Sequence, residues 1–316
     1  MHSGKTKITV VGAGAIGSAV LFTLMLKQLG DELVLINRNQ EKARAKASDI
    51  YHCTGFSGGP GIVSGDFKDS FGSDIVILTA GVLPESDGTR TDVLAKNIAI
   101  YKEMIPEIIK YSPDCVLIVL TNPVDVMAYA AMKISGLEQG RVIGTGTLLD
   151  TIRLKRILAD ETGVSPDCLD VMVIGEHGDY QIPLWFGIRL GGASMLDIAN
   201  KTKRAGWDIR DAKEHSCYAI AYSTVIIVEA MLGRTDSLLP VSVFMKGQYG
   251  IENMYLSLPV KLGRKGVERI FEPELNEVEL SMLKHSADIL VVFFEQADKY
   301  INYEEKGTEN EVQGSK

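Results

Sequence analysis

Short apolar runs alternate with helix-like stretches through the first half of the chain. The expected strands lie at 8–11, 33–36, 75–79 and 116–120, and helices are expected at 18–29 and 92–110. Strands that are apolar throughout and alternate with helices are typical of a parallel sheet covered on both faces. The pattern therefore predicts an α/β unit with a doubly wound parallel sheet.

The pattern changes after Gly146, where the extended stretches are grouped together. Strands are expected at 171–174, 239–244 and 254–262, and helices at 150–162, 211–231 and 276–300. Grouped strands with tight turns are typical of an α+β domain. Because no linker rich in Pro, Gly or Ser separates the halves, we predict two closely packed domains, residues 1–146 and 147–316.

Composition and charge narrow the class of protein. The chain has 316 residues, of which 46% are hydrophobic and 23% charged, and its net charge is -8, so nucleic acid is not an expected partner. No apolar run reaches the roughly 18 residues of a membrane span, and we expect no secretory signal. The four cysteines are widely spaced, which gives no metal or redox motif and favours a reducing cytoplasm.

A glycine-rich turn follows the first expected strand and opens the first expected helix. It reads Gly12-Ala13-Gly14-Ala15-Ile16-Gly17. In this context the glycines permit a tight turn and the close approach of a pyrophosphate, whose charge the helix N-terminus stabilises. The turn predicts a dinucleotide cofactor.

The residues after the second strand leave the choice of nicotinamide cofactor open. An NAD enzyme usually places Asp or Glu about 20 residues beyond the glycine turn, to bind the ribose hydroxyls. This chain has Asn37 and Arg38 there. Asn can still bond a hydroxyl, but it lacks the carboxylate that repels a 2′-phosphate, and Arg38 could attract one. The glycine turn favours NAD, and NADP remains an alternative.

Three polar residues of the second half suggest acid–base chemistry. Asp150 and Arg153 are three residues apart in an expected helix, which places them on one face, although such pairs are commonly surface ion pairs. His177 follows an apolar strand in Gly175-Glu176-His177-Gly178-Asp179, and alone it could equally be structural. Together they supply an orienting carboxylate, a proton donor and a carboxylate-binding fork, as reduction of a 2-keto acid requires.

Six motifs in order give the chain a resemblance to the L-lactate/L-malate dehydrogenase family over residues 7–300. They are the glycine turn, Thr79-Ala80-Gly81, Thr121-Asn122-Pro123-Val124-Asp125, Asp150-x-x-Arg153, the His177 loop, and Leu258-Pro259-x-x-Leu262-Gly263-x-x-Gly266. The resemblance implies a Rossmann sheet followed by an α+β substrate-binding and catalytic domain. It further implies an NAD(P)-dependent L-2-hydroxy acid dehydrogenase that is a homo-oligomer, a dimer or a tetramer.

The same resemblance implies roles for individual residues. Arg153 binds the substrate carboxylate, His177 exchanges a proton with the substrate oxygen, and Asp150 fixes the histidine tautomer. Arg90 polarises the substrate carbonyl from a mobile loop at 81–90. The residues implied to line the cofactor or the substrate are Thr79, Ala80, Gly81, Asn97, Asn122 and Thr145. From the residues alone, Arg90 and Asn97 would be taken as solvent-facing.

Two positions bear on the choice of substrate. Pro84 stands where malate enzymes of the family place Arg and lactate enzymes usually place Gln, and its ring offers no donor. The neighbouring Glu85 and Asp87 would repel a second carboxylate. Ser216 aligns with a Thr of lactate enzymes and leaves slightly more room. We therefore expect pyruvate or a slightly larger monocarboxylic 2-keto acid, such as 2-ketobutyrate or 2-ketoisocaproate, over oxaloacetate.

Three other functions remain to be compared with this one. A malate dehydrogenase would need another cation for the second carboxylate of oxaloacetate. An NAD-dependent glycosidase would need a metal site with Cys and His ligands, and the four cysteines fall outside the motifs. A non-catalytic NAD-binding protein should have lost at least one of Arg90, Asp150, Arg153 and His177, and all four are present.

Overall fold

The structure of the protein is a computed structural model that describes residues 4–82, 90–190, 192–213 and 216–303. The elements of its first half are β1 (Lys7–Val11), α1 (Ala15–Leu26), β2 (Glu32–Ile36), α2 (Gln40–His52), α3 (Thr54–Ser57), β3 (Gly61–Gly65), β4 (Ile75–Leu78), α4 (Arg90–Tyr111), β5 (Val116–Val119), α5 (Val124–Ser135) and β6 (Val142–Gly144). The six strands pair in parallel in the order β3-β2-β1-β4-β5-β6.

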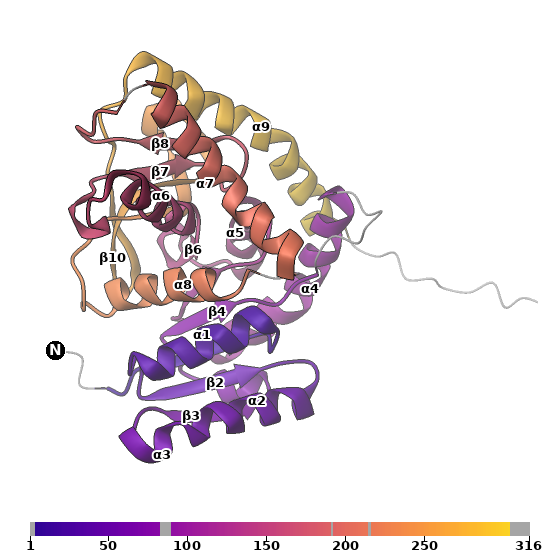
Figure 1. Cartoon of the computed structure of the whole chain (residues 1–316). Coiled ribbons are helices and arrows are strands. Elements are labelled where there is room, and N and C mark those ends of the chain that lie inside the picture. The colour runs from indigo at the N-terminus through magenta and orange to yellow at the C-terminus, as the bar shows by residue number, and fades with distance from the viewer. Residues whose placement is uncertain (1–3, 83–89, 191, 214–215, 304–316) are drawn as a thin grey trace, which may run out of the picture.

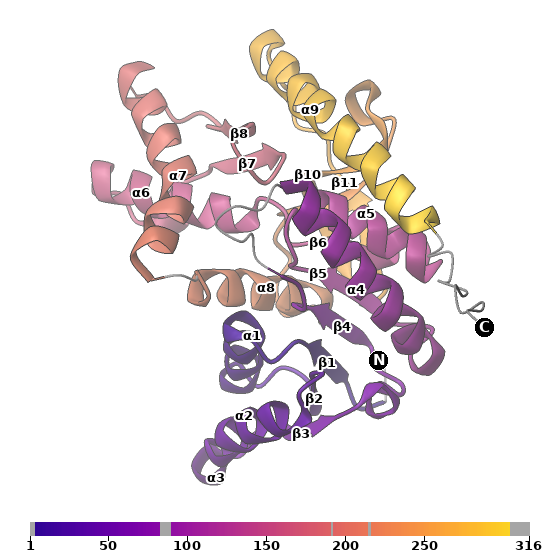
Figure 2. The ribbon, with the colours of Figure 1, turned by 90° about the vertical axis from the view of Figure 1, so that its right-hand side faces the viewer.

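Helices cover both faces of this parallel sheet, as Figure 2 shows with α1 and α2 on one side and α4 and α5 on the other. The strand β4 illustrates why its sequence is apolar throughout. Ile75 and Ile77 pack into the core that contains α1, whereas Val76 and Leu78 pack into the core that contains α4 and α5. Every β4 side chain is therefore buried, and the predicted doubly wound class is confirmed.

The second half extends the same sheet. Its elements are α6 (Leu148–Thr162), β7 (Met172–Gly175), β8 (Gln181–Leu184), α7 (Gly192–Lys213), α8 (Tyr218–Met231), β9 (Leu239–Lys246), β10 (Glu252–Gly263), β11 (Gly266–Ile270) and α9 (Glu277–Asn302). The strands β9, β10, β7 and β8 pair antiparallel, and β9 joins β6 through Gly144 and Ser242. Within the described residues, eleven strands thus form one sheet (Figure 1).

The single helix expected at 211–231 is wrong. The helix α7 ends at Lys213, α8 begins at Tyr218, and Ser216 and Cys217 between them are not helical. The two helices pack on different partners, α7 on α6 and α8 on α1, and they run in different directions in Figure 1. The helical spacing of apolar residues continues through both helices, so the sequence pattern does not reveal the break between them. The break exists because α7 and α8 pack against different helices.

The last helix, α9, closes the fold over the face of the sheet that carries α4 and α5. The side chain of Asn276 caps it by accepting hydrogen bonds from the backbone N–H groups of Val278 and Glu279, and the carboxylate of Glu279 accepts one from the N–H of Asn276. Its buried stripe consists of Leu283, Ser286, Ala287, Leu290, Phe294 and Ala297. Across the described ranges, no helix is both long and apolar enough to span a bilayer.

Candidate active site

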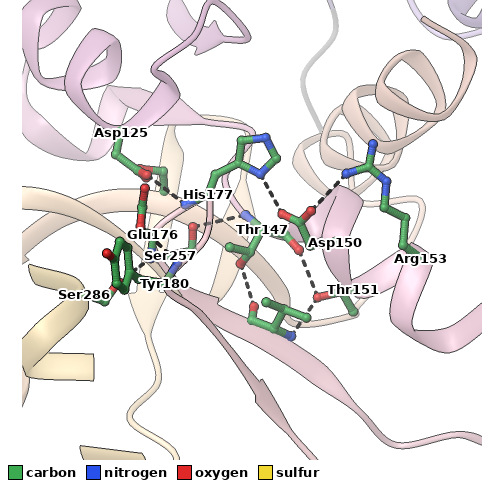
Figure 3. A network of polar contacts seen from close by, with 12 residues as sticks. Asp125, Thr147, Asp150, Thr151, Arg153, Glu176, His177, Tyr180, Ser257 and Ser286 are labelled. Atoms are coloured by element: carbon green, nitrogen blue, oxygen red, sulfur yellow. Dashed lines mark hydrogen bonds and ion pairs between the residues drawn. The ribbon is translucent and has the colours of Figure 1, made fainter. Parts of the chain in front are cut away.

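The carboxylate of Asp150 holds two other polar side chains, one at each oxygen (Figure 3). The Nδ1 atom of His177 lies 2.6 Å from Oδ2, and Nη1 of Arg153 donates to Oδ1 at 3.0 Å. Asp150 stands in the first turn of α6, and His177 lies two residues after the end of β7. The predicted grouping of these three residues therefore exists, and one carboxylate fixes the spacing of the other two.

The environment shifts both members of the Asp150–His177 pair toward their charged forms. Burial alone would raise the pKa of Asp150, but the charge of His177 and its hydrogen bond, with help from Arg153, hold it below the usual value. Burial alone would lower the pKa of His177, and Asp150 raises it above the usual value. With Nδ1 donating to the carboxylate, Nε2 is the ring nitrogen left to exchange a proton with a ligand.

Arg153 is mostly buried but not fully satisfied. Its side chain is 13% exposed, and among the described residues no hydrogen-bond acceptor reaches its buried Nε atom. Nη1 is occupied by Asp150. Nε and Nη2 lie on one edge of the planar guanidinium, so this edge can accept a planar anion such as a carboxylate.

Buried polar groups fix the backbone of the loop that carries His177. The N–H of His177 donates to Oδ2 of Asp125 at 3.0 Å, and Oγ of Ser242 donates to the other oxygen of the same carboxylate at 2.5 Å. The N–H of Glu176 donates to Oγ of Ser286 at 2.9 Å. The loop is therefore held from α5, β9 and α9 at once.

A second set of hydroxyl contacts ties the start of α6 to β7. Oγ1 of Thr147 donates to the carbonyl of Val173 at 2.5 Å, and Oγ1 of Thr151 accepts from the N–H of Val173 at 2.9 Å. The N–H of Thr147 in turn donates to Oγ of Ser257 on β10 at 3.1 Å. Asp150 and His177 are thus carried by two elements that are bonded to each other (Figure 3).

The glycine turn has the shape that a pyrophosphate requires. Gly12 has φ of 117°, and a Cβ there would lie 2.5 Å from Oγ1 of Thr79, so only glycine fits. A Cβ on Gly17 would clash with the carbonyl oxygen of Gly12. A Cβ on Gly14 would meet nothing within 4 Å, which leaves open space beside the N-terminus of α1 at Ala15 and Ile16. The residues present fit a dinucleotide.

Asn37 takes part in this turn. Its Oδ1 accepts from the N–H of Ala13 at 3.1 Å, and its Nδ2 donates to the carbonyl of Asn39 at 3.1 Å. Arg38 is exposed at the same edge of the sheet. The amide of Asn37 therefore has an internal structural use that the sequence did not indicate.

The carboxyl ends of β4, β5 and β6 meet beside the turn, where open α/β sheets bind ligands. Asn97 of α4 is fully buried, which corrects the solvent-facing prediction made from the residues alone. Its Oδ1 accepts from the N–H of Val82 at 2.7 Å, and its Nδ2 donates to the carbonyl of Asn122 at 3.0 Å.

The other residues predicted at these strand ends also contact one another or the sheet. Thr121 donates to the carbonyl of Ala80 at 2.7 Å, and a Cβ on Gly81 would crowd Thr121. Buried Thr145 donates its N–H to Val119 at 3.0 Å.

Some predicted site residues are not placed by the structure. Pro84, with Glu85 and Asp87, lies outside the described residues. Arg90 is the first residue of α4, and the structure describes its backbone but not its side chain. Ser216 is half-buried between α7 and α8. The roles of Pro84, Arg90 and Ser216 stay predictions.

Sequence reasoning gave no role to several residues that support the site, notably Asp125, Ser242 and Ser286. Asp125 was quoted only as part of a motif. A detectable signal existed for the two serines: Ser242 interrupts the apolar run of β9, and Ser286 lies on the buried stripe of α9. Buried hydroxyls in such positions need hydrogen-bond partners.

Comparison with known proteins finds matches to both halves of the chain. Residues 6–144 match the model of the lactate/malate dehydrogenase NAD-binding domain, and residues 147–300 match that of the alpha/beta C-terminal domain of the same family. L-lactate dehydrogenases of Clostridium perfringens (strain SM101) and Clostridium botulinum (strain Langeland) are 38% identical over 300 and 301 residues, which cover 90% of this chain and 95% of theirs.

Solved structures give the same picture. The minor L-lactate dehydrogenase from Enterococcus mundtii, in its ligands-bound form, superposes with a TM-score of 0.87 at 31% identity, over 92% of this chain and 98% of that one. MGS-M5, a lactate dehydrogenase from a Medee basin deep-sea metagenome library, gives a TM-score of 0.89 at 31% identity, over 93% and 99%.

Proposed function

The chain belongs to the lactate/malate dehydrogenase family, and we propose that it interconverts L-lactate, or a slightly larger monocarboxylic L-2-hydroxy acid, and the matching 2-keto acid. The observation that carries the proposal is the single carboxylate of Asp150, which holds His177 and Arg153 through its two oxygens. This arrangement sets a proton-transfer group and a carboxylate-binding group at a fixed spacing. A 2-hydroxy acid presents a hydroxyl and a carboxylate at a similarly fixed spacing.

A nicotinamide dinucleotide would be held by the glycine turn and by the residues at the ends of β4, β5 and β6. The open space at Gly14 and the N-terminus of α1 suit its pyrophosphate. When bound, the cofactor supplies or accepts the hydride. Asn122 is exposed beside this edge, as a residue that touches both cofactor and substrate must be.

His177 performs the proton transfer in this proposal. In reduction, Nε2 of the imidazolium donates a proton to the substrate carbonyl oxygen, and in oxidation the neutral ring accepts the hydroxyl proton. Asp150 accepts from Nδ1 in both states, so it keeps the tautomer and stabilises the charged ring. The raised pKa of His177 favours the protonated ring, which is the proton donor in reduction.

Arg153 binds the substrate carboxylate in this proposal. A buried N–H without an acceptor costs about 1–3 kcal/mol, and the Nε atom of Arg153 is such a group among the described residues. A carboxylate on the edge formed by Nε and Nη2 would satisfy it with two parallel hydrogen bonds. Nη1 would stay on Asp150 throughout.

For the choice of substrate, we infer a preference for pyruvate-like acids over oxaloacetate from Pro84, Glu85 and Asp87, and extra room from Ser216. The curated relatives, which are L-lactate dehydrogenases, support the first part of this inference. For the cofactor, we infer NAD with NADP as the alternative. The homo-oligomer and the cytoplasmic location stay predictions.

The test is steady-state kcat/KM for pyruvate, 2-ketobutyrate, 2-ketoisocaproate and oxaloacetate, with the wild type and His177→Asn. We expect monocarboxylic acids to lead, and the variant to lose about 10²-fold or more in kcat because proton transfer is lost. A folded variant with near-normal turnover would remove His177 from the mechanism. Oxaloacetate tenfold above every monocarboxylic acid would overturn the substrate preference.

A further inference from the structure

A hollow of about 500 Å³ lies away from the proposed active site. It is lined by residues 230–236 at the end of α8, by residues 261–264 at the end of β10, and by Glu268 of β11. Arg234, one of its residues, bonds the backbone just after α1. From there to the glycine turn, α1 spans 12 residues, or about 18 Å. The hollow is therefore separate from the groups proposed to hold cofactor and substrate.

Two arginines from different segments line this hollow. Nη1 and Nη2 of Arg234 donate to the backbone carbonyls of Lys27 and Gln28 at 3.3 and 2.9 Å. Arg264, in the turn between β10 and β11, has its Nη1 atom 3.5 Å from Oγ1 of Thr6. A guanidinium has five N–H donors, so both arginines keep donors for a ligand. Their planar, charged groups suit the oxygens of a phosphate-type anion.

The acidic residues of the hollow leave this positive charge in excess. Asp236 forms an ion pair with Lys261, so these two charges cancel. Within the ranges that the structure describes, no ion pair holds Arg234, Arg264 or Glu268. Two cations therefore face one acid, in a chain whose net charge is -8. A local excess of positive charge attracts an anion.

Glu268 decides which anion fits. A Cβ built on Gly263 would clash with Oε1 of Glu268, so this carboxylate lies against the backbone directly before Arg264. The glycine belongs to the motif at 258–266, to which the proposed function gives no role. An ionised carboxylate accepts hydrogen bonds and donates none. It therefore repels an anion without a proton, whereas it can accept a hydrogen bond from the O–H of hydrogen phosphate.

This requirement separates hydrogen phosphate from similar anions. Sulfate carries no proton near neutral pH. A phosphate monoester loses its last proton near pH 6, since its second pKa is about 6. Inorganic phosphate keeps one proton until the solution is strongly alkaline. At pH 8, inorganic phosphate is thus the one of these three anions that offers oxygens to the arginines and an O–H to the carboxylate.

We propose that the hollow is a binding site for inorganic hydrogen phosphate, in which Arg234 and Arg264 donate to its oxygens and Glu268 accepts its O–H. The site takes no part in hydride or proton transfer, and the proposal does not rest on the proposed function. Both arginines lie in the second half of the chain and contact residues of the first half. Bound phosphate therefore stabilises the packing of the two halves.

The test is isothermal titration calorimetry of the NADH-loaded protein at pH 8 and constant ionic strength. The three probes are inorganic phosphate, sulfate and glycerol 3-phosphate, and NADH occupies the glycine turn. We expect saturable binding of inorganic phosphate. Sulfate and the ester should bind about tenfold more weakly or worse, because they leave the carboxylate without a donor. Saturating inorganic phosphate should also raise the Tm.

Three variants locate the binding. Arg264→Gln removes a charged donor and should weaken phosphate binding about tenfold or more. Arg269→Gln is the matched control, because it removes the same charge from β11 outside the hollow, where Arg269 stacks on Phe271. It should leave the affinity for phosphate nearly unchanged. Glu268→Gln should bring the affinities for sulfate and glycerol 3-phosphate close to that for phosphate. The Tm without phosphate checks that each variant is folded.

Several results would overturn the proposal. One is the absence of saturable phosphate binding by the wild type. Another is an equal loss of affinity in Arg264→Gln and Arg269→Gln, which would reflect only the general charge of the surface. If sulfate binds the wild type as tightly as phosphate, or if Glu268→Gln leaves the selectivity unchanged, the hollow does not recognise the phosphate proton. None of these measurements uses dehydrogenase activity, so a failure of the proposed function would be seen separately.

Discussion

The backbone N–H of His177 donates a hydrogen bond to the buried carboxylate of Asp125, 52 residues earlier in the chain, at 3.0 Å. Asp125 lies in the first turn of α5, directly after the loop that carries Asn122. The carboxylate of Asp125 therefore links the Asn122 loop, which is proposed to contact the cofactor, to His177, which is proposed to transfer the proton. Burial raises the pKa of Asp125, while its hydrogen bonds with Ser242 and His177 and the charge of His177 act against this, and its ionised form places a negative charge behind the imidazole.

We expect Asp125→Asn to lower the pKa of His177. Burial lowers this pKa, while the charge of Asp150 and, more weakly, that of Asp125 raise it. The amide can still accept the N–H of His177 but carries no charge. In pyruvate reduction, which needs the imidazolium, kcat/KM should therefore decline at a lower pH than in the wild type. In lactate oxidation the acid limb should move to lower pH as well.

Ser242→Ala is the companion variant, because it keeps the carboxyl group of Asp125 but removes the hydrogen bond that most lowers the pKa of Asp125, and it should shift the profiles in the same direction by a smaller amount. Its pH profiles should stay closer to those of the wild type. Unchanged profiles for Asp125→Asn, measured in both directions, would mean that Asp125 supports only the fold of the loop.

A second prediction concerns Glu176, next to His177. Burial, with a smaller contribution from the charge of Asp125, raises its pKa from 4.5 to about 7. The unfolded chain ionises this group near its ordinary pKa, so between these two values the folded state holds the extra proton. The free energy of unfolding therefore falls as the pH rises from about 4.5 to 7.

Glu176→Gln removes this loss, and its amide oxygen can still accept the N–H of Tyr180 as Oε2 now does at 3.3 Å. Denaturant unfolding should show the variant and the wild type equally stable near pH 4. At pH 8 the variant should be more stable by something of the order of 2 kcal/mol. Equal stability at both pH values would show that Glu176 ionises normally in the folded protein.

The third prediction concerns the cofactor. Asn37→Asp should raise the ratio of kcat/KM for NADH over NADPH, because a carboxylate accepts ribose hydroxyls and repels a 2′-phosphate. One carboxylate oxygen can accept the N–H of Ala13 as Oδ1 of Asn37 does now. Arg38→Ala should change the ratio in the same direction by removing the cation. A wild-type ratio well below one would reverse our preference for NAD.

The sequence predicted those parts of the site that depend on local spacing. Asp150 and Arg153 share a helix face because three residues make nearly one turn, and the strand before His177 is recognisable from its apolar run. Position along the chain cannot show which distant groups meet. The contact of Asp125 with His177 depends on how α5 packs beside β7 and the loop that follows it.

Two errors have the same physical cause. Asn97 is polar and lies in an amphipathic helix, so residue type alone favours exposure, yet two backbone groups from neighbouring loops satisfy its amide in the interior. The break between α7 and α8 leaves the helical spacing of apolar residues intact, so only the different packing partners reveal it. In both cases, contacts between distant parts of the chain determine the burial of a residue or the end of a helix, and residue type and spacing do not.

The join between β6 and β9 has a consequence for how such a protein can be built. Gly144 pairs with Ser242, and a Cβ on Gly144 would lie 2.8 Å from Cβ of Ser242, so the two strands meet where one of them has no side chain. The same Ser242 donates to Asp125. The cofactor-binding and catalytic halves are therefore not interchangeable modules. A chimaera that takes its first half from a relative must keep a glycine at position 144 and an acid at position 125, because both contact Ser242 of the second half. Without them, we expect it to lose both the pairing of β6 with β9 and the support of the loop that carries His177.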